Sequence, residues 1–260
     1  MRINMLISAI LSFSFLTACA SCSKGEDSDG AMNVGTQTSS ETDTTTTADV
    51  PMLLYMGQAS IRITTEEGRV IYIDPYAGNG YDLAADLILV THEHFDHNAV
   101  EKVRKRQEGC RIIRVSDAVI DGVHQTFDLG YVKVEAVEAG YNRYHDVRSC
   151  AGYVLTFNNG QKVYVSGDTS TTKQMERMSD MHIDYAFLCT DGLYNMDNEE
   201  AAEAAHMIKA RHNIPYHNDT SNRGEMFDRD AAERFDAPNK MIVLPGETIR
   251  IEYKQITDKQ

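Results

Sequence analysis

The chain has 260 residues, and 42% of them are hydrophobic, which is enough for one domain of ordinary size with a full core. It carries 39 acidic against 25 basic side chains, a formal net charge of −14. This acidity argues against a nucleic-acid-binding surface, because such surfaces are built from basic stripes. We therefore expect a small-molecule substrate, and no nucleic acid, as the partner of the folded part.

The first residues are typical of a secretory signal. Arg2 supplies a positive start, and residues 3–15 form an apolar stretch that is too short to span a membrane as a mature helix. Leu16, Thr17, Ala18 and Cys19 resemble the lipobox of bacterial lipoproteins, in which the cysteine is lipidated. We predict a signal peptide over residues 1–18 and an extracytoplasmic lipoprotein, anchored to the membrane through Cys19 on the periplasmic face or the cell surface. A plain secreted protein, cleaved after a small residue, is the alternative.

Residues 19–50 are predicted to be a flexible linker. Residues 25–49 are rich in Ser, Thr, Asp and Gly, with four consecutive threonines at 44–47, and such a composition cannot bury a core. The folded domain is therefore expected over residues 51–260.

Hydrophobic periodicity predicts a domain of many short strands with a few helices between and after them. Strands are expected over residues 52–56, 59–64, 69–73, 86–90, 111–115, 131–137, 151–157, 162–165, 185–189, 214–216, 241–244 and 248–252. Helices are expected from about residue 98 to 106, over 172–178, over 198–211 and over 228–235. Asp197 and Glu200 form a capping box for the third helix, on which His206 and His212 are expected to face solvent or the helix dipole. This order indicates two packed sheets with helices outside.

The strongest chemical signal is the segment His92-Glu93-His94-Phe95-Asp96-His97, which directly follows the apolar run 87–91. Polar groups packed this closely need a partner, and a divalent metal ion satisfies several of them at once. At the end of a strand, His92 and His94 can point the same way and bind one ion. Asp96 and His97 can face a second ion as the chain turns.

Later strand ends offer further ligands. Asp168 follows the strand expected over 162–165, and His217 follows the one over 214–216. His145 lies in a polar loop between two strands and competes with His124, which follows the turn Asp121-Gly122, and with His182, which lies in a stretch without a partner motif. Functional groups gather where loops meet at one edge of a sheet, so we expect His145, Asp168 and His217 to complete the site.

Together the HxHxDH segment, the Ser166-Gly167-Asp168-Thr169 turn and the Ile214-Pro215-Tyr216-His217 segment resemble the metallo-β-lactamase-fold hydrolases. Within them, the chain is most similar to the compact branch that includes ascorbate-6-phosphate lactonase. Segments 54–60, 73–75, 141–142 and 244–247 support this similarity. The resemblance covers about residues 52–251 and implies an α/β fold, a four-layer αβ/βα sandwich of two mixed sheets with helices outside.

The resemblance also implies the ligand sets. His92, His94 and His145 would bind a first ion, Asp96, His97 and His217 a second, and Asp168 would bridge both. Zinc is the expected metal, with manganese or iron as alternatives. Asp74 and Thr91 are placed to support the ligands.

The implied activity is that of a dinuclear metal-dependent hydrolase. A hydroxide shared by the two ions would attack a lactone, ester or phosphoester, with Asp96 as the catalytic proton carrier. The alternatives are a phosphodiesterase acting on lipid headgroups, which membrane tethering would suit, and a non-catalytic metal-binding lipoprotein.

Some positions depart from the branch. Gln58 stands where histidine is frequent, Cys189-Thr190 replaces a common proline, and Asn218-Asp219 follows His217 where tyrosine is frequent. Such changes are compatible with a different substrate. Gln58, Asn142, Tyr144 and Tyr194 are the candidate substrate-binding residues, each with an ordinary loop role as the alternative. Cys110, Cys150 and Cys189 form no paired motif and are expected to be buried free thiols, with Cys189 the candidate if one of them lines the site.

Overall fold

The computed structural model describes residues 49–219 and 226–252, which belong to the compact unit Thr44–Gln260. The predicted signal peptide, Cys19 and nearly all of the predicted linker lie outside the described residues.

Two six-stranded sheets make up most of the domain. The first has the order β14-β1-β2-β3-β4-β5, and its β3–β4 and β4–β5 pairs are parallel. Its strands are β1 Met52–Gly57, β2 Ser60–Thr64, β3 Val70–Ile73, β4 Ala85–Leu89, β5 Arg106–Ile113 and β14 Thr248–Arg250. The second has the order β13-β12-β11-β10-β9-β8, and its β11–β12 and β12–β13 pairs are parallel. Its strands are β8 Thr126–Asp128, β9 Val132–Glu138, β10 Ala151–Phe157, β11 Lys162–Val165, β12 Tyr185–Cys189 and β13 His212–Tyr216.

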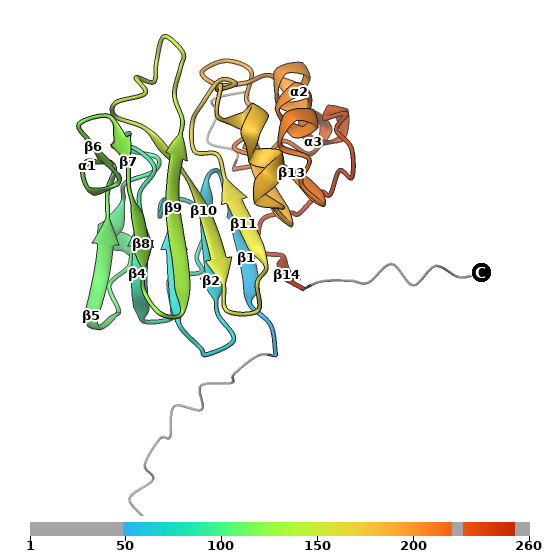
Figure 1. Cartoon of the computed structure of the whole chain (residues 1–260). Coiled ribbons are helices and arrows are strands. Elements are labelled where there is room, and N and C mark those ends of the chain that lie inside the picture. The colour runs from blue at the N-terminus through green and yellow to red at the C-terminus, as the bar shows by residue number, and fades with distance from the viewer. Residues whose placement is uncertain (1–48, 220–225, 253–260) are drawn as a thin grey trace, which may run out of the picture. The chain divides into compact units, whose positions relative to one another are not determined.

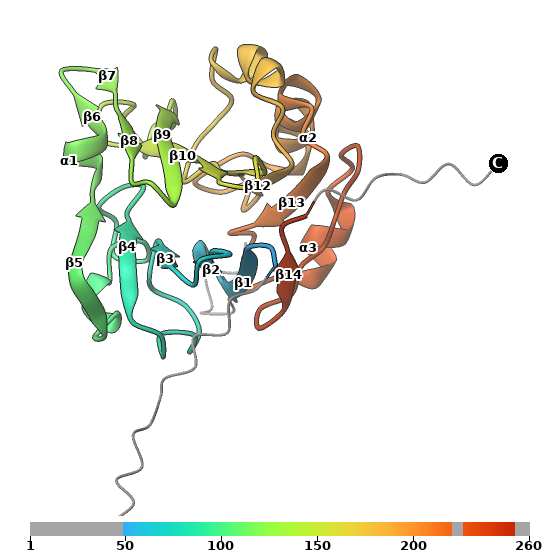
Figure 2. The same cartoon turned by 60° about the horizontal axis from the view of Figure 1, so that its bottom comes forward.

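The sheets stack face to face as two layers (Figure 2). Alternation along each strand divides the side chains between two sides. In β3, Ile71 and Ile73 join the large core cluster between the sheets, whereas Val70 and Tyr72 join a smaller cluster on the outer side. Each fully buried aliphatic side chain contributes about 1.5–3 kcal/mol, so the shared core holds the two sheets together.

Helices are short. The described helices are α1 Val115–Ala118, α2 Asn198–Ile208, α3 Arg229–Arg234 and the 3₁₀ turns η1 Val100–Lys102 and η2 Met175–Met181. A small antiparallel hairpin joins β6 Val119–Ile120 to β7 Val123–His124. Helix α2 covers the outside of the second sheet, whereas α1 lies at one end of the sandwich beside β5 and β6 (Figures 1 and 2), and its Val115 and Ala118 join the core between the sheets. The Asp197 side chain caps α2, as predicted, by accepting hydrogen bonds from the backbone of Glu199 and Glu200. The reciprocal half of the predicted capping box does not form, because the Glu200 carboxylate accepts from the backbone N–H of Thr171 at 2.8 Å. The two-sheet sandwich predicted from the sequence is therefore confirmed, with fewer helical residues than expected.

Three of the predicted elements are wrong. The helix expected up to Arg106 is only the turn η1, since the apolar residues Val100 and Val103 are three apart and satisfy a 3₁₀ turn equally well. The helix expected to reach Arg211 ends at Ile208, because Lys209 takes a left-handed conformation with φ of 57°, and His212 begins β13 instead. The strand expected over 241–244 is absent from the described part of the chain, where Asn213 and Lys240 form only an isolated bridge.

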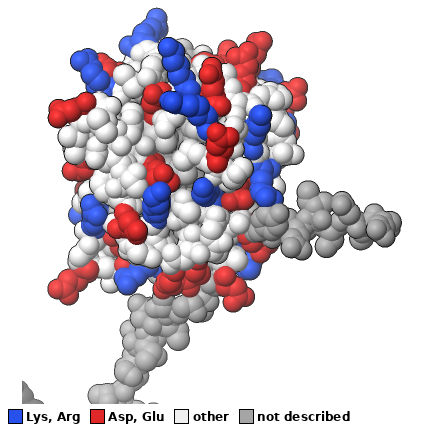
Figure 3. Space-filling view, viewed as in Figure 1, with Lys and Arg blue, Asp and Glu red and all other residues white. Residues whose placement is uncertain are grey.

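On the face shown in Figure 3, basic and acidic side chains are interspersed, so this face carries no patch of a single charge. No helix within residues 49–219 and 226–252 is long and apolar enough to cross a membrane.

Candidate metal centre

The candidate ligands gather where strands end. His92, His94, Asp96 and His97 follow β4, Asp168 follows β11, and His217 follows β13. His145 lies in the loop between β9 and β10. Residues separated by more than a hundred positions in the chain thus meet at one edge of the sandwich.

Three overlapping groups of side chains have candidate ligand atoms within 4.8 Å of one another. They are His92, His94 and His145; His92, His97 and Asp168; and Asp96, His97 and His217. The first and third are the two sets implied by the sequence, and the second links them.

Asp168 lies between the two sets. Its Oδ2 is 3.3 Å from His145 Nε2 and 3.9 Å from His92 Nε2. Its Oδ1 is 3.3 Å from His97 Nε2 and 3.5 Å from His217 Nε2. Each oxygen of the carboxylate therefore faces one set of histidines.

Most of the cluster is buried, with His94 exposed and Asp96 half-buried, and several of its inward-facing atoms make no hydrogen bond to the part of the chain that the structure describes. Among the described residues, His92 Nε2, His97 Nε2 and Asp168 Oδ1 are shielded from water and make no hydrogen bond. Leaving a buried polar atom unsatisfied costs about 1–3 kcal/mol. Nitrogen and carboxylate oxygen donors of this kind bind zinc and similar divalent ions, so the residues present fit a metal.

Outer side chains hold the imidazoles with Nε2 directed inward. His97 Nδ1 donates to Asp74 Oδ2 at 2.9 Å, and Thr91 donates to the same oxygen through its hydroxyl at 2.7 Å. His145 Nδ1 lies 3.1 Å from Asn142 Oδ1, whereas His217 Nδ1 makes no hydrogen bond to a described residue and faces Asp191 Oδ2 at 3.5 Å. Hydrogen-bond partners such as Asp74 and Asn142 fix the tautomer and orientation of metal-binding histidines.

Burial and mutual charge together determine the protonation of the cluster without metal. Burial and the positive charge of His97 lower the pKa of His92 to about 2. Burial lowers the pKa of His217 as well, but the negative charge of Asp168 and a hydrogen bond to Asp96 outweigh it and raise that pKa to about 9. Burial also disfavours the ionised form of Asp168, yet the charges of His217 and His97 hold its pKa well below the usual range. The carboxylate is therefore anionic, as a metal ligand must be.

A hollow of about 430 Å³ opens onto the cluster, a size typical of small-molecule sites. It is lined by His94, Phe95, Asp96, Tyr144, His145, Asp168, Tyr194 and His217. Tyr144 and Tyr194, two of the predicted substrate-binding residues, thus lie at the site. Gln58 and Asn142 are placed behind it instead, since the Gln58 amide donates to Asp96 Oδ2 at 3.1 Å and Asn142 contacts His145.

Comparison with known proteins agrees with this geometry. Residues 52–217 match the family described as the beta-lactamase superfamily domain. A UPF0173 metal-dependent hydrolase of Rubrobacter xylanophilus is 30% identical over 230 residues, which cover 76% of this chain and 95% of that protein. The chain belongs to the UPF0173 metal-dependent hydrolases, with the metallo-β-lactamase fold.

Solved structures of other metal hydrolases resemble this UPF0173 hydrolase. One from Parabacteroides distasonis, described as a metal-dependent hydrolase, is 28% identical and has a TM-score of 0.58, and the match covers 73% of this chain and 91% of that protein. Igni18, a metallo hydrolase of Ignicoccus hospitalis, has a TM-score of 0.61, and the match covers 78% of this chain and 99% of that protein. Because the two sequences are only 21% identical, this match shows the fold alone. Because these names give no substrate, the similarity to ascorbate-6-phosphate lactonase stays a prediction.

Two residues at the site of this hydrolase were missed in the sequence. Asp191 follows β12 in the same way that Asp168 follows β11, a pattern that could have identified it. Phe95 sits inside the ligand segment and was overlooked because its neighbours carry the chemistry. Cys189 does not line the hollow: it is buried, and its Sγ lies 3.5 Å from the Thr169 carbonyl oxygen.

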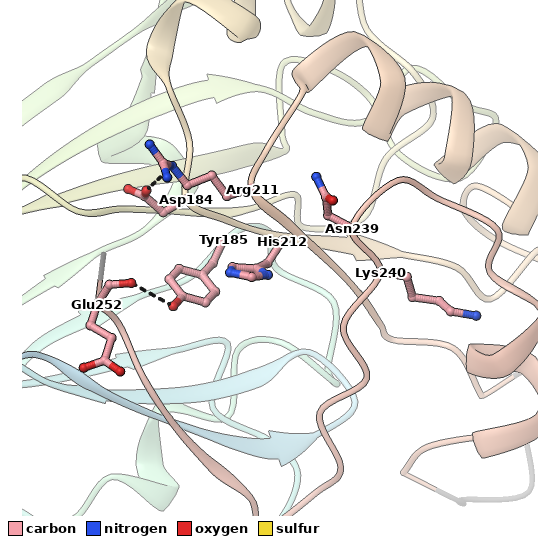
Figure 4. Close-up of a pocket in the computed structure, with 7 residues that line it drawn as sticks. All are labelled: Asp184, Tyr185, Arg211, His212, Asn239, Lys240 and Glu252. Carbon is pink, nitrogen blue, oxygen red and sulfur yellow. Dashed lines mark hydrogen bonds and ion pairs between the residues drawn. The ribbon is translucent and has the colours of Figure 1, made fainter. Parts of the chain in front are cut away.

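A second hollow of the hydrolase, of about 360 Å³, lies at the opposite ends of β12 and β13 (Figure 4). There Tyr185 stacks on His212 with ring centroids 4.9 Å apart, and Arg211 pairs with Asp184 at 3.1 Å. The Tyr185 hydroxyl donates to the Glu252 carbonyl oxygen at 3.3 Å. None of the three ligand groups found among the described residues includes a residue of this hollow, so we place the chemistry at the other end of the strands.

Proposed function

We propose that the chain is a dinuclear metal-dependent hydrolase of a lactone, ester or phosphoester, with zinc in both positions. The observation that carries this proposal is the placement of Asp168, whose two oxygens each face a separate set of histidines at 3.3–3.9 Å. One ion would be held by His92, His94 and His145. The other would be held by Asp96, His97 and His217, and Asp168 would contact both ions. When bound, such ions supply Lewis acidity and lower the pKa of water to near neutrality.

Asp96 is the proposed proton carrier. Burial disfavours its ionised form, but a hydrogen bond from His217 and the charges of both His97 and His217 lower its pKa below the usual range, so it is ionised in the metal-free site, the form in which it would have to accept a proton. The Gln58 amide holds its Oδ2 in place. Because Asp96 lines the hollow, it can pass the proton from the attacking water to the leaving oxygen of a substrate there.

The proposal includes an extracytoplasmic location through a lipidated Cys19, supported by the signal-like pattern of residues 1–19. Its test is a Cys19→Ala variant, expected to move from the membrane to the soluble fraction of the cell. Cys22→Ala is the matched control and is expected to stay with the membrane. Equal distribution of both variants would refute the anchor.

Metal analysis and a substrate panel test the activity. The purified domain is expected to bind two equivalents of metal and to hydrolyse members of a panel of lactones, esters and phosphodiesters. Asp96→Ala is the blank, expected to lose hydrolysis. Less than one equivalent of bound metal would refute the enzyme, and activity unchanged in Asp96→Ala would refute the site. Metal without hydrolysis of any panel member would favour a binding lipoprotein, and hydrolysis confined to phosphodiesters would favour action on lipid headgroups.

A further inference from the structure

Aromatic side chains form the part of the hollow that offers no metal ligand. Phe95, Tyr144 and Tyr194 line it beside the histidines, and we call these three residues the aromatic wall. Phe95 is 75% exposed, and Tyr144 and Tyr194 are more than a third exposed. Single exposed aromatics are ordinary, but a group of them around one hollow marks a surface that a ligand covers.

The wall is held in a defined shape by ring packing. Tyr144 and Tyr194 come from loops about fifty residues apart and meet edge to face, with ring centroids 4.9 Å apart and an interplanar angle of 72°. Phe95 packs edge to face on Tyr76, with centroids 5.8 Å apart. Edge-to-face pairs of this kind favour one relative orientation of the rings.

Asn142 ties Tyr144 to a metal ligand. Its Oδ1 accepts the backbone N–H of Tyr144 at 2.9 Å and that of His145 at 3.0 Å, and it also lies 3.1 Å from His145 Nδ1. One side-chain oxygen therefore sets both the loop that carries the tyrosine and the orientation of the histidine.

Asp191 anchors the loop of Tyr194 and faces His217 without a hydrogen bond to it. Its Oδ1 accepts the backbone N–H of Leu193 at 2.8 Å and that of Tyr194 at 2.7 Å, while its Oδ2 lies 3.5 Å from His217 Nδ1. The loops of both tyrosines are thus anchored on side chains that face the ligand cluster, so a group packed on the tyrosines lies beside the reacting atoms.

Charge recognition is lacking at the wall. Among the described residues that line the hollow there is no lysine or arginine, and the acidic ones are Asp96 and Asp168. Arg143 is next to the wall, but its guanidinium lies over the Tyr144 ring, 4.4 Å from the centroid, and donates to the Tyr144 hydroxyl. An anionic substituent resting on the wall would lose water and would find no lysine or arginine among the described lining residues. Pairing with Arg143 would draw its guanidinium away from the Tyr144 ring, whereas an apolar substituent needs no partner.

We propose that the aromatic wall binds an apolar acyl or aryl group of an uncharged ester or lactone, whose carbonyl then faces the ligand cluster. This inference rests on the proposed hydrolase function and narrows its substrate class. It disfavours substrates that carry a phosphate or carboxylate away from the bond that is cleaved.

The test measures, in a pH-stat, how fast the zinc-loaded full domain hydrolyses three esters. Ethyl phenylacetate and ethyl hexanoate are apolar, and monoethyl succinate has a similar length but carries a carboxylate. Wild type is expected to prefer the two apolar esters. Tyr194→Ala and Phe95→Ala are each expected to lower kcat/KM for those esters roughly tenfold, with zinc content unchanged. Tyr194→Phe, which keeps the ring, is expected to retain the preference, and Ile120→Ala, an exposed apolar side chain outside the hollow, is the matched control.

A second readout separates this inference from the proposed function. Calorimetric titration with phenylacetate and acetate is expected to show tighter binding of phenylacetate in wild type and a loss of that difference in Tyr194→Ala. Ester hydrolysis without an apolar preference would refute the wall and leave the hydrolase standing. A tyrosine-dependent preference for phenylacetate without hydrolysis of any ester would support the wall and refute the hydrolase. If Phe95→Ala weakens binding to phosphatidylglycerol vesicles but leaves ester kinetics unchanged, the face meets a membrane and the wall is refuted.

Discussion

Replacing Asp74 by Asn is expected to weaken metal binding about ten- to a hundredfold, the range seen when partners of metal-binding histidines are changed. Asp74 follows β3 and is fully buried. Its Oδ1 accepts the Thr91 backbone N–H at 2.8 Å, and its Oδ2 accepts both the Thr91 hydroxyl and His97 Nδ1. Asparagine fits the backbone, because its side chain tolerates the positive φ of 45° found there.

The amide cannot reproduce the hydrogen bonds of the carboxylate. It has a single acceptor oxygen, and if that oxygen takes the Thr91 N–H, an NH₂ group faces His97 Nδ1. His97 would then accept at Nδ1 and carry its proton on Nε2, the atom directed at the cluster, where a metal could not bind. A ten- to hundredfold loss equals about 1.4–2.7 kcal/mol of binding free energy. Loss of a charge-assisted hydrogen bond would also cost about 1.5–3 kcal/mol of folding stability.

Asp86 offers a matched control. It is also buried and also joins β4 to β3, accepting from the Val70 backbone at 2.8 Å and from Arg69 at 2.9 Å, but it lies at the other end of the strands from the cluster. Asp86→Asn is expected to lower stability and leave metal affinity unchanged. Competition with a chromophoric chelator measures the affinity, and denaturant unfolding of the metal-free proteins measures the stability. Wild-type metal affinity in Asp74→Asn, or an equal loss in both variants, would refute the tautomer argument.

Three further outcomes are expected. Removal of metal with a chelator should lower the free energy of unfolding by about 2.7 kcal/mol for each ion bound, relative to protein with free metal a hundredfold above its Kd, and an unchanged thermal midpoint would contradict a bound metal. Zinc binding should release protons, because the raised pKa values of His97 and His217 keep both side chains protonated at neutral pH in the metal-free site. The zinc affinity should therefore rise as the pH approaches the His217 pKa of about 9. Calorimetry in buffers of different ionisation enthalpy measures the proton release, and equal apparent binding enthalpies in all buffers would contradict it. Gly167→Ala should destabilise the fold and lower the metal content, because the added Cβ would lie 2.9 Å from Thr91 Cβ, at a φ of +61°, directly before Asp168. Gly160→Ala is the control: its φ is +83° and no described atom beyond its two chain neighbours lies within 4 Å of the added Cβ, so it should show the backbone cost alone.

The sequence predicted the central strands well and the peripheral ones poorly. Strands β10, β11 and β12 were predicted with their observed bounds, because each is an apolar run that ends at a turn or at polar residues. Strand β5 was expected only over 111–115, yet it begins at Arg106 and most of it is exposed. An exposed edge strand carries charged residues that resemble a helix surface or a loop, so hydrophobic periodicity cannot reveal it.

For the site, the sequence indicated residues but not their partners. The seven proposed ligands were each found from a local pattern, a His or Asp directly after an apolar run or in a polar loop. The contacts of Asn142 with His145 and of Asp191 with His217 depend on how two loops fold back on themselves, which no local pattern shows. Asn142 was for that reason expected to contact substrate, although it contacts a ligand.

Sheet topology explains why strand ends were a reliable guide to ligands and why His145 was the hardest to choose. Strands β11, β12 and β13 run parallel, so the residues that follow them, Asp168, Asp191 and His217, must lie at one edge. The loop that carries His145 joins antiparallel strands and could lie at either edge. Because β10 runs antiparallel to β11 and to β9, the end of β9 and the start of β10 lie at the edge where β11 ends. The direction of β10 therefore brings His145 to the metal centre, whereas His124 belongs to the separate β6–β7 hairpin.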